Sequence, residues 1–386
     1  MRVAILTSGR FHVLNLACEL VRLGHDVTFY SLVPPWRTRR FGLPDRHARW
    51  LGPWVGPLWL AARALGPTSA GRVAQRAMAE ALDMAASRLV GPCDAFIGMS
   101  GMSLYTLRRV KRRFGATTFV ERASLHIREQ KRILDARPRR PGGASDVPDW
   151  VVAREESEYA EADLISVPAS HAAASFLARG VPAERLVSNP FGVSLDEFPP
   201  TPAPPHEPPR ILSTSVWSWQ KGSDLLASAL ALVRVALPSA ELVHVGPVGD
   251  LPLPAAPGFH HVDAVPQARL SSFYAAAHAL ALPSRQDGLP VVTLQALASG
   301  VPVVCSTRAA GHDLAARVDV PSAVTVVPPD DVQALADALI AVLSRRPPPG
   351  APRALLGPEA RRELTWQAYG ERWSATLARV VRRQAS

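Results

Sequence analysis

The sequence predicts an α/β protein in which two doubly wound parallel sheets, each covered by helices on both faces, face each other across a cleft. The first observation is length, because 386 residues exceed the ~100–200 residues of an ordinary domain. The second is composition: 47% apolar residues are enough to fill two cores. The third is the alternation, in both halves, of short β-branched runs with longer helical stretches, which is typical of parallel sheets.

A proline-rich segment, residues 199–209, separates the two halves. Proline fixes φ and supplies no backbone donor, so this segment can join no sheet and predicts a stiff spacer. We therefore expect a Rossmann-like first domain over 1–200, a second over 201–365, and a closing helix within 366–386 that packs back on the first domain. The expected strands are Val3–Thr7, Val27–Ser31, Ala95–Met99, Thr117–Val120 and Leu164–Val167, then Ile211–Thr214, Glu241–Val245, Ala279–Leu282, Val301–Cys305 and Ala323–Val327.

Several classes of protein are excluded by what the sequence lacks. No run reaches the ~18 uncharged apolar residues of a membrane-spanning helix, and the longest candidate, Leu51–Leu65, is broken by glycine and proline. The three cysteines lie far apart, which offers neither a disulfide framework nor a zinc site. The start, Met1–Thr7, is typical of a buried strand and not of a signal peptide, so we expect a cytoplasmic protein.

The formal net charge is +10, and most of the excess lies in the first 200 residues, in Arg108–Arg113, in Arg128–Arg140 and after Trp36. Such clusters attract nucleic acid, acidic lipid headgroups or phosphorylated substrates, or they are simply solvated helix faces. No nucleic-acid motif accompanies them, so a nucleic-acid partner is not expected. Trp54 and Trp59 lie near these charges in the sequence, which suits docking on an anionic membrane, an acceptor pocket or plain core.

The clearest ligand site lies in the second half, where the strand Ala279–Leu282 leads through Pro283–Pro290 into a helix that begins near Val291. Doubly wound sheets bind ligands beyond the carboxyl ends of their strands, where helix N-termini attract anions. Gly288 allows close backbone approach, and the amides between Gly288 and Val292 predict an anion site. Asp287 would then be a polar ligand contact or an ordinary helix cap.

The segment Pro283–Val304 is similar to the signature of glycosyltransferase family 4, which reads roughly P-S-x-x-E-G-F-x-x-x-x-x-E-A-x-A-x-G-x-P-V-V. Trp219-Gln220-Lys221-Gly222 resembles the family's lysine-glycine step, and Glu121–His126 resembles an E-R-x-S-x-H stretch of some members. These stretches occur in the same order as in that family, and the resemblance spans nearly the whole chain. The resemblance implies a GT-B fold and a retaining enzyme that uses nucleotide sugars.

The resemblance also implies roles for individual residues. Asp287 would contact hydroxyls of the transferred sugar, Gln295 the ribose hydroxyls, and Lys221 the donor diphosphate. His126, Asp287 and Lys221 are the expected catalytic residues, with His126 near the donor sugar. The other expected donor-binding residues are Gly9 and His12, in the loop after the first strand, together with Arg285, Gly288, Leu289, Pro290 and Val291.

Three positions depart from the family pattern. Asp287 stands where glutamate is usual, which draws the carboxylate back by about 1.5 Å. Gln295 is neutral, and neutral hydrogen bonds are roughly half as strong as charge-assisted ones. Ser215 and Val216 occupy the place of the family's arginine, so a bidentate diphosphate clamp is missing unless Arg285 supplies one.

The implied reaction moves a sugar from a nucleoside diphosphate, with UDP the expected nucleotide, to an acceptor hydroxyl with retention of configuration. No Asp-x-Asp motif is present, so we expect no metal and no cofactor. The basic first domain suits a lipid-linked or phosphorylated glycan acceptor, as in cell-surface polysaccharide or glycolipid synthesis. The alternatives are a catalytically inactive partner or scaffold subunit, and a GT-B epimerase or phosphorylase.

Overall fold

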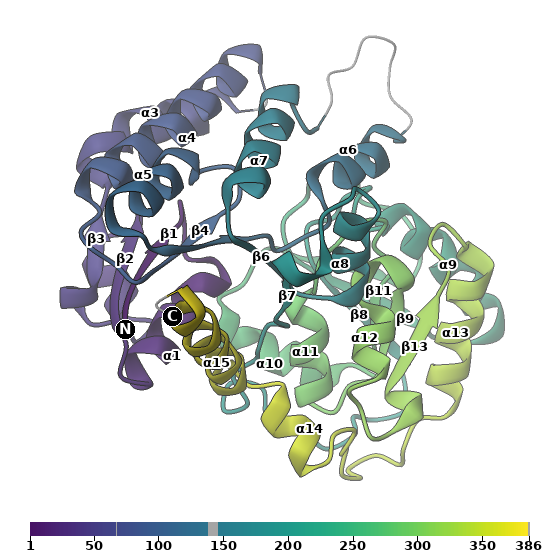
Figure 1. Cartoon of the computed structure of the whole chain (residues 1–386). Helices are drawn as coiled ribbons and strands as arrows, with labels where there is room; N and C mark the ends of the chain where they lie inside the picture. Colours follow the sequence, from purple (N-terminus) through teal and green to yellow (C-terminus); the bar gives the residue numbers. More distant parts are fainter. Residues whose placement is uncertain (67, 138–145, 385–386) are drawn as a thin grey trace.

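The computed structural model describes residues 1–66, 68–137 and 146–384, and they form two lobes, each built on its own parallel sheet (Figure 1). The strands of the first sheet are β1 (Arg2–Leu6), β2 (Asp26–Ser31), β3 (Ala48–Trp50), β4 (Ala95–Met99), β5 (Thr117–Glu121), β6 (Leu164–Val167) and β7 (Leu186–Ser188). Those of the second are β8 (Arg210–Thr214), β9 (Glu241–Val245), β10 (Phe259–Val262), β11 (Ala279–Leu282), β12 (Val303–Ser306) and β13 (Val324–Val327).

Both sheets are parallel throughout the described residues, with the strand orders β3-β2-β1-β4-β5-β6-β7 and β10-β9-β8-β11-β12-β13. The predicted fold class is therefore confirmed. Three strands, β3, β7 and β10, were not predicted, and each lies at the edge of its sheet. These three edge strands are short and half exposed, so they lack the continuous apolar run from which a buried parallel strand can be predicted.

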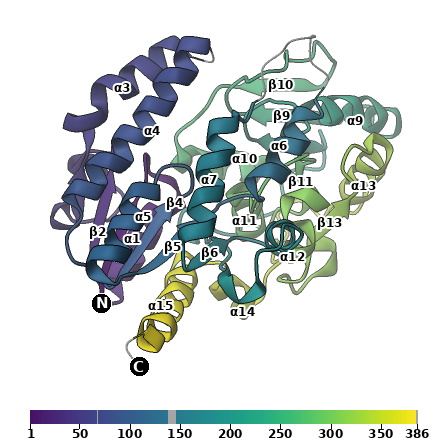
Figure 2. The same cartoon turned by 45° about the horizontal axis from the view of Figure 1, so that its top comes forward.

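Helices cover both faces of each sheet (Figures 1 and 2). Those of the first half are α1 (Phe11–Arg22), α2 (Pro35–Arg39), α3 (Gly52–Leu65), α4 (Ser69–Leu89), α5 (Leu104–Phe114), α6 (Ile127–Asp135), α7 (Asp149–Glu161) and α8 (Ser170–Leu177). Those of the second are α9 (Ser223–Ala236), α10 (Gln267–Ala276), α11 (Val291–Ala298), α12 (Gly311–Ala315), α13 (Val332–Ser344), α14 (Pro358–Glu363) and α15 (Trp366–Gln384). Short 3₁₀ turns span Asp45–His47, Ala183–Arg185, Thr307–Ala309 and Pro321–Ala323.

Alternation along the strands divides the core into layers. In β1, Val3 and Ile5 face one core and Ala4 and Leu6 face another, because successive side chains of a strand point to opposite faces. The first of these cores continues into the second lobe, where it includes Leu212 of β8. The outer face of the second sheet has a core of its own, filled mainly from α9 and α13. Both lobes thus share one buried layer.

The C-terminal helix α15 lies against α1 of the first lobe, as both views show (Figures 1 and 2). Gly370 lets the two helices approach closely, since a Cβ at this position would lie 2.4 Å from the Cβ of Glu19. Trp373 is fully buried and packs edge-to-face on Phe119 of β5, at 5.2 Å between ring centroids. This helix ties the end of the chain to the lobe in which the chain begins.

The proline-rich segment forms neither helix nor strand, but it is not a free spacer. The amide of Thr201 donates to the Ser299 carbonyl at 3.2 Å, and the amide of Ala203 donates to the Ala351 carbonyl at 2.9 Å. The segment is therefore fastened along the second lobe. The chain crosses between lobes just before it, where the Val193 amide donates to the Leu364 carbonyl at 2.7 Å.

Candidate functional site

The second sheet reverses its strand order between β8 and β11, which is where a doubly wound sheet binds ligands. The loops that follow these two strands, residues 215–222 and 283–290, touch each other. The Arg285 amide donates to the Gln220 carbonyl at 2.9 Å. Gly222, with φ +69°, packs so tightly that a Cβ would lie 2.2 Å from the Pro283 carbonyl oxygen. The two loops therefore form one continuous edge for a ligand.

Lys221 and Asp287 meet at this edge in a short ion pair between Nζ and Oδ2. The Lys221 side chain is 23% exposed and the Asp287 side chain 17%, so both remain reachable from solvent. The other carboxylate oxygen of Asp287 accepts from the Gly288 amide at 3.0 Å. Two residues that the sequence resemblance assigned to the donor are thus side by side, and in this structure they neutralise each other.

Gly288 is the point of closest contact with the first lobe. A Cβ added here would lie 2.0 Å from the Ala123 carbonyl oxygen and 3.1 Å from the Ser124 Cα. Leu289 and Pro290, which follow, are buried, and α11 begins at Val291 as predicted. The first amides of a helix have no partner within the helix, so the start of α11 can donate to an anion.

Gln295 lies on α11 and is 6% exposed. Its Oε1 accepts from the hydroxyl of Tyr274 at 3.0 Å, and that hydroxyl also contacts Thr214 at the end of β8, at 3.2 Å. Burial raises the pKa of Tyr274, so its hydroxyl keeps its proton and remains able to donate. Tyr274 uses one lone pair of Oε1, so Gln295 can offer a ligand the N–H donors of its amide and the second lone pair.

The sequence left open whether Arg285 supplies the missing diphosphate clamp. Its contacts in the structure differ from those of such a clamp. Its guanidinium is buried and donates to the carboxylate of Asp224 at 2.6 and 2.8 Å, to the carboxylate of Asp330 at 2.5 Å and to the Trp219 carbonyl at 2.8 Å. It also lies over the Trp219 ring, 4.4 Å from the centroid. A diphosphate would have to displace the carboxylates of Asp224 and Asp330 from Arg285. Arg285 therefore holds the loops together and does not replace the missing family arginine.

His126 begins α6, where its Nδ1 accepts from the Arg128 amide at 3.2 Å. The imidazole is 4% exposed and packs against Tyr159 and Phe176, at 5.1 and 4.9 Å between centroids. Burial lowers its pKa to about 4; the charge of Glu156 opposes this shift, and the charge of Arg179 adds to it to a smaller extent. The ring is therefore neutral at pH 7 and serves as a helix cap within the core, although the loop before it faces the second lobe.

Replacing His126 with asparagine tests this assignment. Asparagine keeps the capping acceptor but does not titrate. A histidine whose folded pKa is depressed stabilises the fold above its unfolded pKa of ~6.5, and this stability is lost as pH falls toward the folded value. The melting temperature of His126→Asn should therefore fall less than that of the unchanged protein between pH 6.5 and pH 4. Sugar transfer at pH 7 should stay within about threefold, and a loss of a hundredfold or more would instead place His126 on the substrate.

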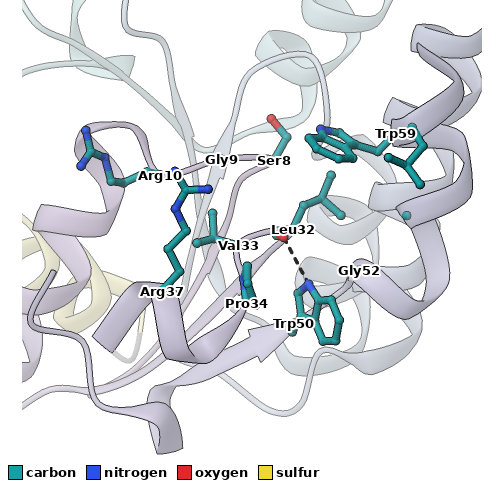
Figure 3. Close-up of a pocket in the computed structure, with 12 residues that line it drawn as sticks. Ser8, Gly9, Arg10, Leu32, Val33, Pro34, Arg37, Trp50, Gly52 and Trp59 are labelled. Atoms are coloured by element: carbon teal, nitrogen blue, oxygen red, sulfur yellow. Dashed lines mark hydrogen bonds between the residues drawn. The ribbon is translucent and has the colours of Figure 1, made fainter. Parts of the chain in front are cut away.

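Gly9 and His12 lie at the corresponding point of the first sheet, where the strand order reverses between β1 and β4. Gly9 lines a cavity in the first lobe, which Figure 3 shows. His12 turns away from that cavity: its Nε2 lies 3.0 Å from Oε1 of Glu121, and its ring stacks on Phe191 at 4.1 Å. The Glu121 side chain is fully buried, so His12 serves to partner an interior carboxylate.

Several contacts bring the carboxyl edges of the two sheets face to face. The Gln286 amide donates to the Ser124 hydroxyl, and His171 Nε2 lies 2.9 Å from the Asp287 carbonyl oxygen. Asp313 accepts from the hydroxyl of Ser170 at 2.9 Å. Ser124, Ser170 and His171 follow β5 and β6 of the first lobe. The 283–290 loop of the second lobe is called the donor loop below, because the sequence resemblance assigns it to the donor. It is thus covered by the segments that follow β5 and β6 of the first lobe.

No sequence signal pointed to Tyr274, which donates to Gln295, or to Gln286, which donates to Ser124. Tyr274 is a single aromatic residue in α10 with no motif around it. A signal did exist for Ser124, because it lies in the Glu121–His126 stretch that carried part of the resemblance. Within that stretch Ala123 and Ser124 face the second lobe, and the histidine points into the core.

Several arginines and lysines of the two basic stretches form ion pairs with carboxylates. Arg108 and Lys111 of α5 form ion pairs with Glu161 and Asp163. In the second stretch, Arg128 pairs with Glu156 and Arg132 with Glu129, while residues 138–140 lie outside the described residues. Two of the five cations of the α5 stretch are thus paired, so the positive charge of that helix is only partly offset.

In the described residues, no group of three or more histidine, cysteine, aspartate or glutamate side chains is placed to hold a metal ion. None of the helices in the described ranges combines the length and the apolar character needed to span a bilayer.

Comparison with known proteins agrees with this architecture. Residues 208–345 match the family described as Glycosyl transferases group 1. A search of curated protein sequences finds no match. The whole chain superposes on sucrose-phosphate synthase from Thermosynechococcus elongatus with a TM-score of 0.68 at 18% identity, covering 98% of this chain and 99% of that one.

Two further structures are similar over the same length. HepE from Anabaena, solved with UDP-glucose, gives a TM-score of 0.67 at 12% identity and covers 98% of this chain and 100% of its own. Trehalose-6-phosphate synthase from E. coli, bound with UDP-2-fluoro glucose, gives 0.65 at 12% identity and covers 98% and 99%. The chain therefore has the GT-B fold, and the expected resemblance to the glycosyltransferases of this fold is confirmed.

Proposed function

We propose that this chain of GT-B fold is a glycosyltransferase that moves a sugar from a nucleoside diphosphate to an acceptor hydroxyl. The observation that carries the proposal is the position of Lys221 beside Asp287 and the start of α11, at the switch point of the second sheet and under the loops of the first lobe. The family match of residues 208–345 supports it. UDP is the proposed nucleotide, since HepE binds UDP-glucose and the E. coli synthase binds UDP-2-fluoro glucose.

The main barrier to this reaction is charge separation. The sugar becomes positively charged at its anomeric carbon while negative charge collects on the departing diphosphate. A cation and unpaired helix amides that are already in place stabilise that charge without reorganising. In this proposal Lys221, once it has left Asp287, and the amides of Gly288, Leu289, Val291 and Val292 supply these groups, and we propose that they suffice without a metal ion.

We propose that configuration is retained by reaction on a single face of the sugar. The bond between the anomeric carbon and the diphosphate oxygen breaks, and the acceptor oxygen forms its bond to the same carbon from the same side. The acceptor proton passes to the departing phosphate oxygen, so no nucleophile of the protein is required. Closure of the two lobes excludes water, which would otherwise take the place of the acceptor.

Asp287 has two tasks in this proposal. Without a donor it partners Lys221, and with a donor bound it releases the lysine to the diphosphate and accepts from hydroxyls of the sugar. Asp287→Asn should separate these tasks. UDP binding should tighten about two- to fivefold, because an ion pair worth up to ~1 kcal/mol no longer competes. Transfer should fall about 10- to 100-fold, because hydrogen bonds to a charged acceptor worth ~1.5–3 kcal/mol are lost.

Calorimetry with UDP, GDP and ADP, followed by transfer assays on the nucleotide that binds, tests the whole proposal. Asp26→Asn, a neutralised exposed carboxylate at the start of β2, is the matched control and should change neither quantity. Binding of none of the three nucleotides would favour an inactive partner subunit. Conversion of the donor sugar in the absence of any acceptor would favour an epimerase or a phosphorylase.

We further propose that the acceptor belongs to cell-surface polysaccharide or glycolipid synthesis and that the first lobe contacts an anionic membrane surface. Support comes from exposed tryptophans beside arginines. Trp36 is 55% exposed with Arg40 over its ring, and Trp59 is 42% exposed with Arg63 over its ring. Such pairs are typical of surfaces that meet lipid headgroups, where apolar anchors and cations act together.

A further inference from the structure

A cavity of about 470 Å³ opens in the first lobe at the carboxyl ends of β1, β2 and β3 (Figure 3). Its walls come from the loop after β1, the loop after β2, and the helices α2 and α3. The volume lies within the ~300–1,000 Å³ of small-molecule sites. The same edge of the first sheet, farther along at β5 and β6, covers the donor loop of the second lobe.

One end of the cavity is positively charged. Arg10 and Arg37 both line this end, at the left of Figure 3, and the charge of Arg37 acts on Arg10. Within the described parts of the chain, neither side chain forms a hydrogen bond or an ion pair, and Arg10 is held over the ring of Phe41 at 4.3 Å. Burial and then the charge of Arg37 lower the pKa of Arg10, with a weaker opposing effect of Glu197. Two cations that repel each other are stabilised by an anion placed between them.

The opposite end is apolar. Figure 3 shows the Trp59 indole and Leu32 away from the arginines, with Val33 between Leu32 and Arg37, and Leu60 also lines the cavity. Trp50 forms a fixed wall, because its Nε1 donates to the Leu32 carbonyl at 3.2 Å. Among the described residues that line the cavity, none carries an acidic side chain. The cavity is therefore cationic at one end and apolar at the other.

Gly56 forms part of the wall from within α3. Glycine inside a helix is ~1 kcal/mol less favourable than alanine, so its presence needs a reason. A Cβ at Gly56 would meet no atom within 4 Å, so packing against the protein does not supply that reason. The missing side chain instead leaves the helix surface open to the cavity.

We propose that this cavity is the acceptor site and that it binds a lipid-linked phosphate or diphosphate, with the phosphate between Arg10 and Arg37 and the apolar chain along Trp59 and Leu60. Its role as an acceptor site rests on the proposed function, whereas the binding of such a ligand does not. Charge complementarity and the apolar far wall select the phosphate lipid over a free sugar, which would leave that wall exposed to water. Trp54 (66% exposed) and Trp59 (42% exposed) lie on α3, the helix that forms part of the cavity wall, and offer apolar surface beside it.

The test uses dodecyl phosphate below its micelle concentration as the probe and the full-length protein. Binding is followed by calorimetry and by tryptophan fluorescence, since Trp50 and Trp59 line the cavity. We expect dodecyl phosphate to bind at least tenfold more tightly than inorganic phosphate or the uncharged dodecyl maltoside. Arg10→Gln/Arg37→Gln should weaken binding at least tenfold, and Gly56→Leu should abolish it by filling the cavity while favouring the helix.

Arg76→Gln/Arg88→Gln removes the same charge from α4, outside the cavity, and should bind dodecyl phosphate like the unchanged protein. Equal loss in this control would show a diffuse charged surface and overturn the proposal. Equal binding of inorganic phosphate would identify a site for free phosphate, and equal binding of dodecyl maltoside an apolar patch; either result overturns it. All variants are also titrated with UDP, so failure of the donor site is seen separately from failure of this cavity.

Discussion

Lys221→Ala should reduce the rate of sugar transfer by about 10²- to 10³-fold, the usual effect of removing one preorganised group that stabilises developing negative charge. The effect should be large because Arg285 is held by Asp224 and Asp330, and Ser215 and Val216 provide no cation. UDP binding should also weaken, because the diphosphate loses its ion pair. Calorimetry and initial rates of UDP release measure both quantities.

Two variants make this result specific. Lys221→Arg keeps the charge and should recover part of the rate. Lys111→Ala removes a lysine from α5, where it pairs with Asp163, and should leave both the rate and the binding unchanged. If Lys221→Ala transferred sugar at more than a tenth of the normal rate, the phosphate would have to be stabilised elsewhere, and the assignment of the donor site would be wrong.

Gly288→Ala should keep the two lobes from closing. Its Cβ would lie 2.0 Å from the Ala123 carbonyl oxygen, a backbone atom that cannot turn aside as a flexible side chain could. The lobes must separate by about 1 Å or more, and a displacement of that size at a reacting centre costs about 10²-fold in rate. The maximal rate should therefore fall strongly, while UDP, whose proposed site lies mainly on the second lobe, should bind within about threefold of normal.

Small-angle scattering with and without UDP would show whether Gly288→Ala stays open. Gly91→Ala is the matched control, because a Cβ at Gly91 meets no atom within 4 Å and its φ is not in the left-handed region. It should behave like the unchanged protein. Normal turnover by Gly288→Ala would mean that the contact between Gly288 and Ala123 does not form during the reaction.

The sequence predicted the central strands well and the edges of the sheets poorly. Strands such as β4 and β11 are buried on both faces, so their apolar runs are continuous and need no partner to be found. The edge strands β3, β7 and β10 are half exposed and depend on a neighbouring strand for their hydrogen bonds. The linker was found from its prolines, but its hydrogen bonds to Ser299 and Ala351 come from parts of the chain that are distant in sequence.

By itself, the sequence determined the two-lobed α/β fold and the local motif that places Asp287, Gly288 and Gln295 around one turn and one helix, because these depend on local periodicity and spacing. Tertiary structure alone decided what the charged and polar side chains meet. It paired Lys221 with Asp287, held Arg285 between two carboxylates, turned His126 into the core and His12 toward Glu121. The physical reason is that the free energy of a charge depends on its burial and on partners brought from other strands and helices, and only the folded chain supplies these.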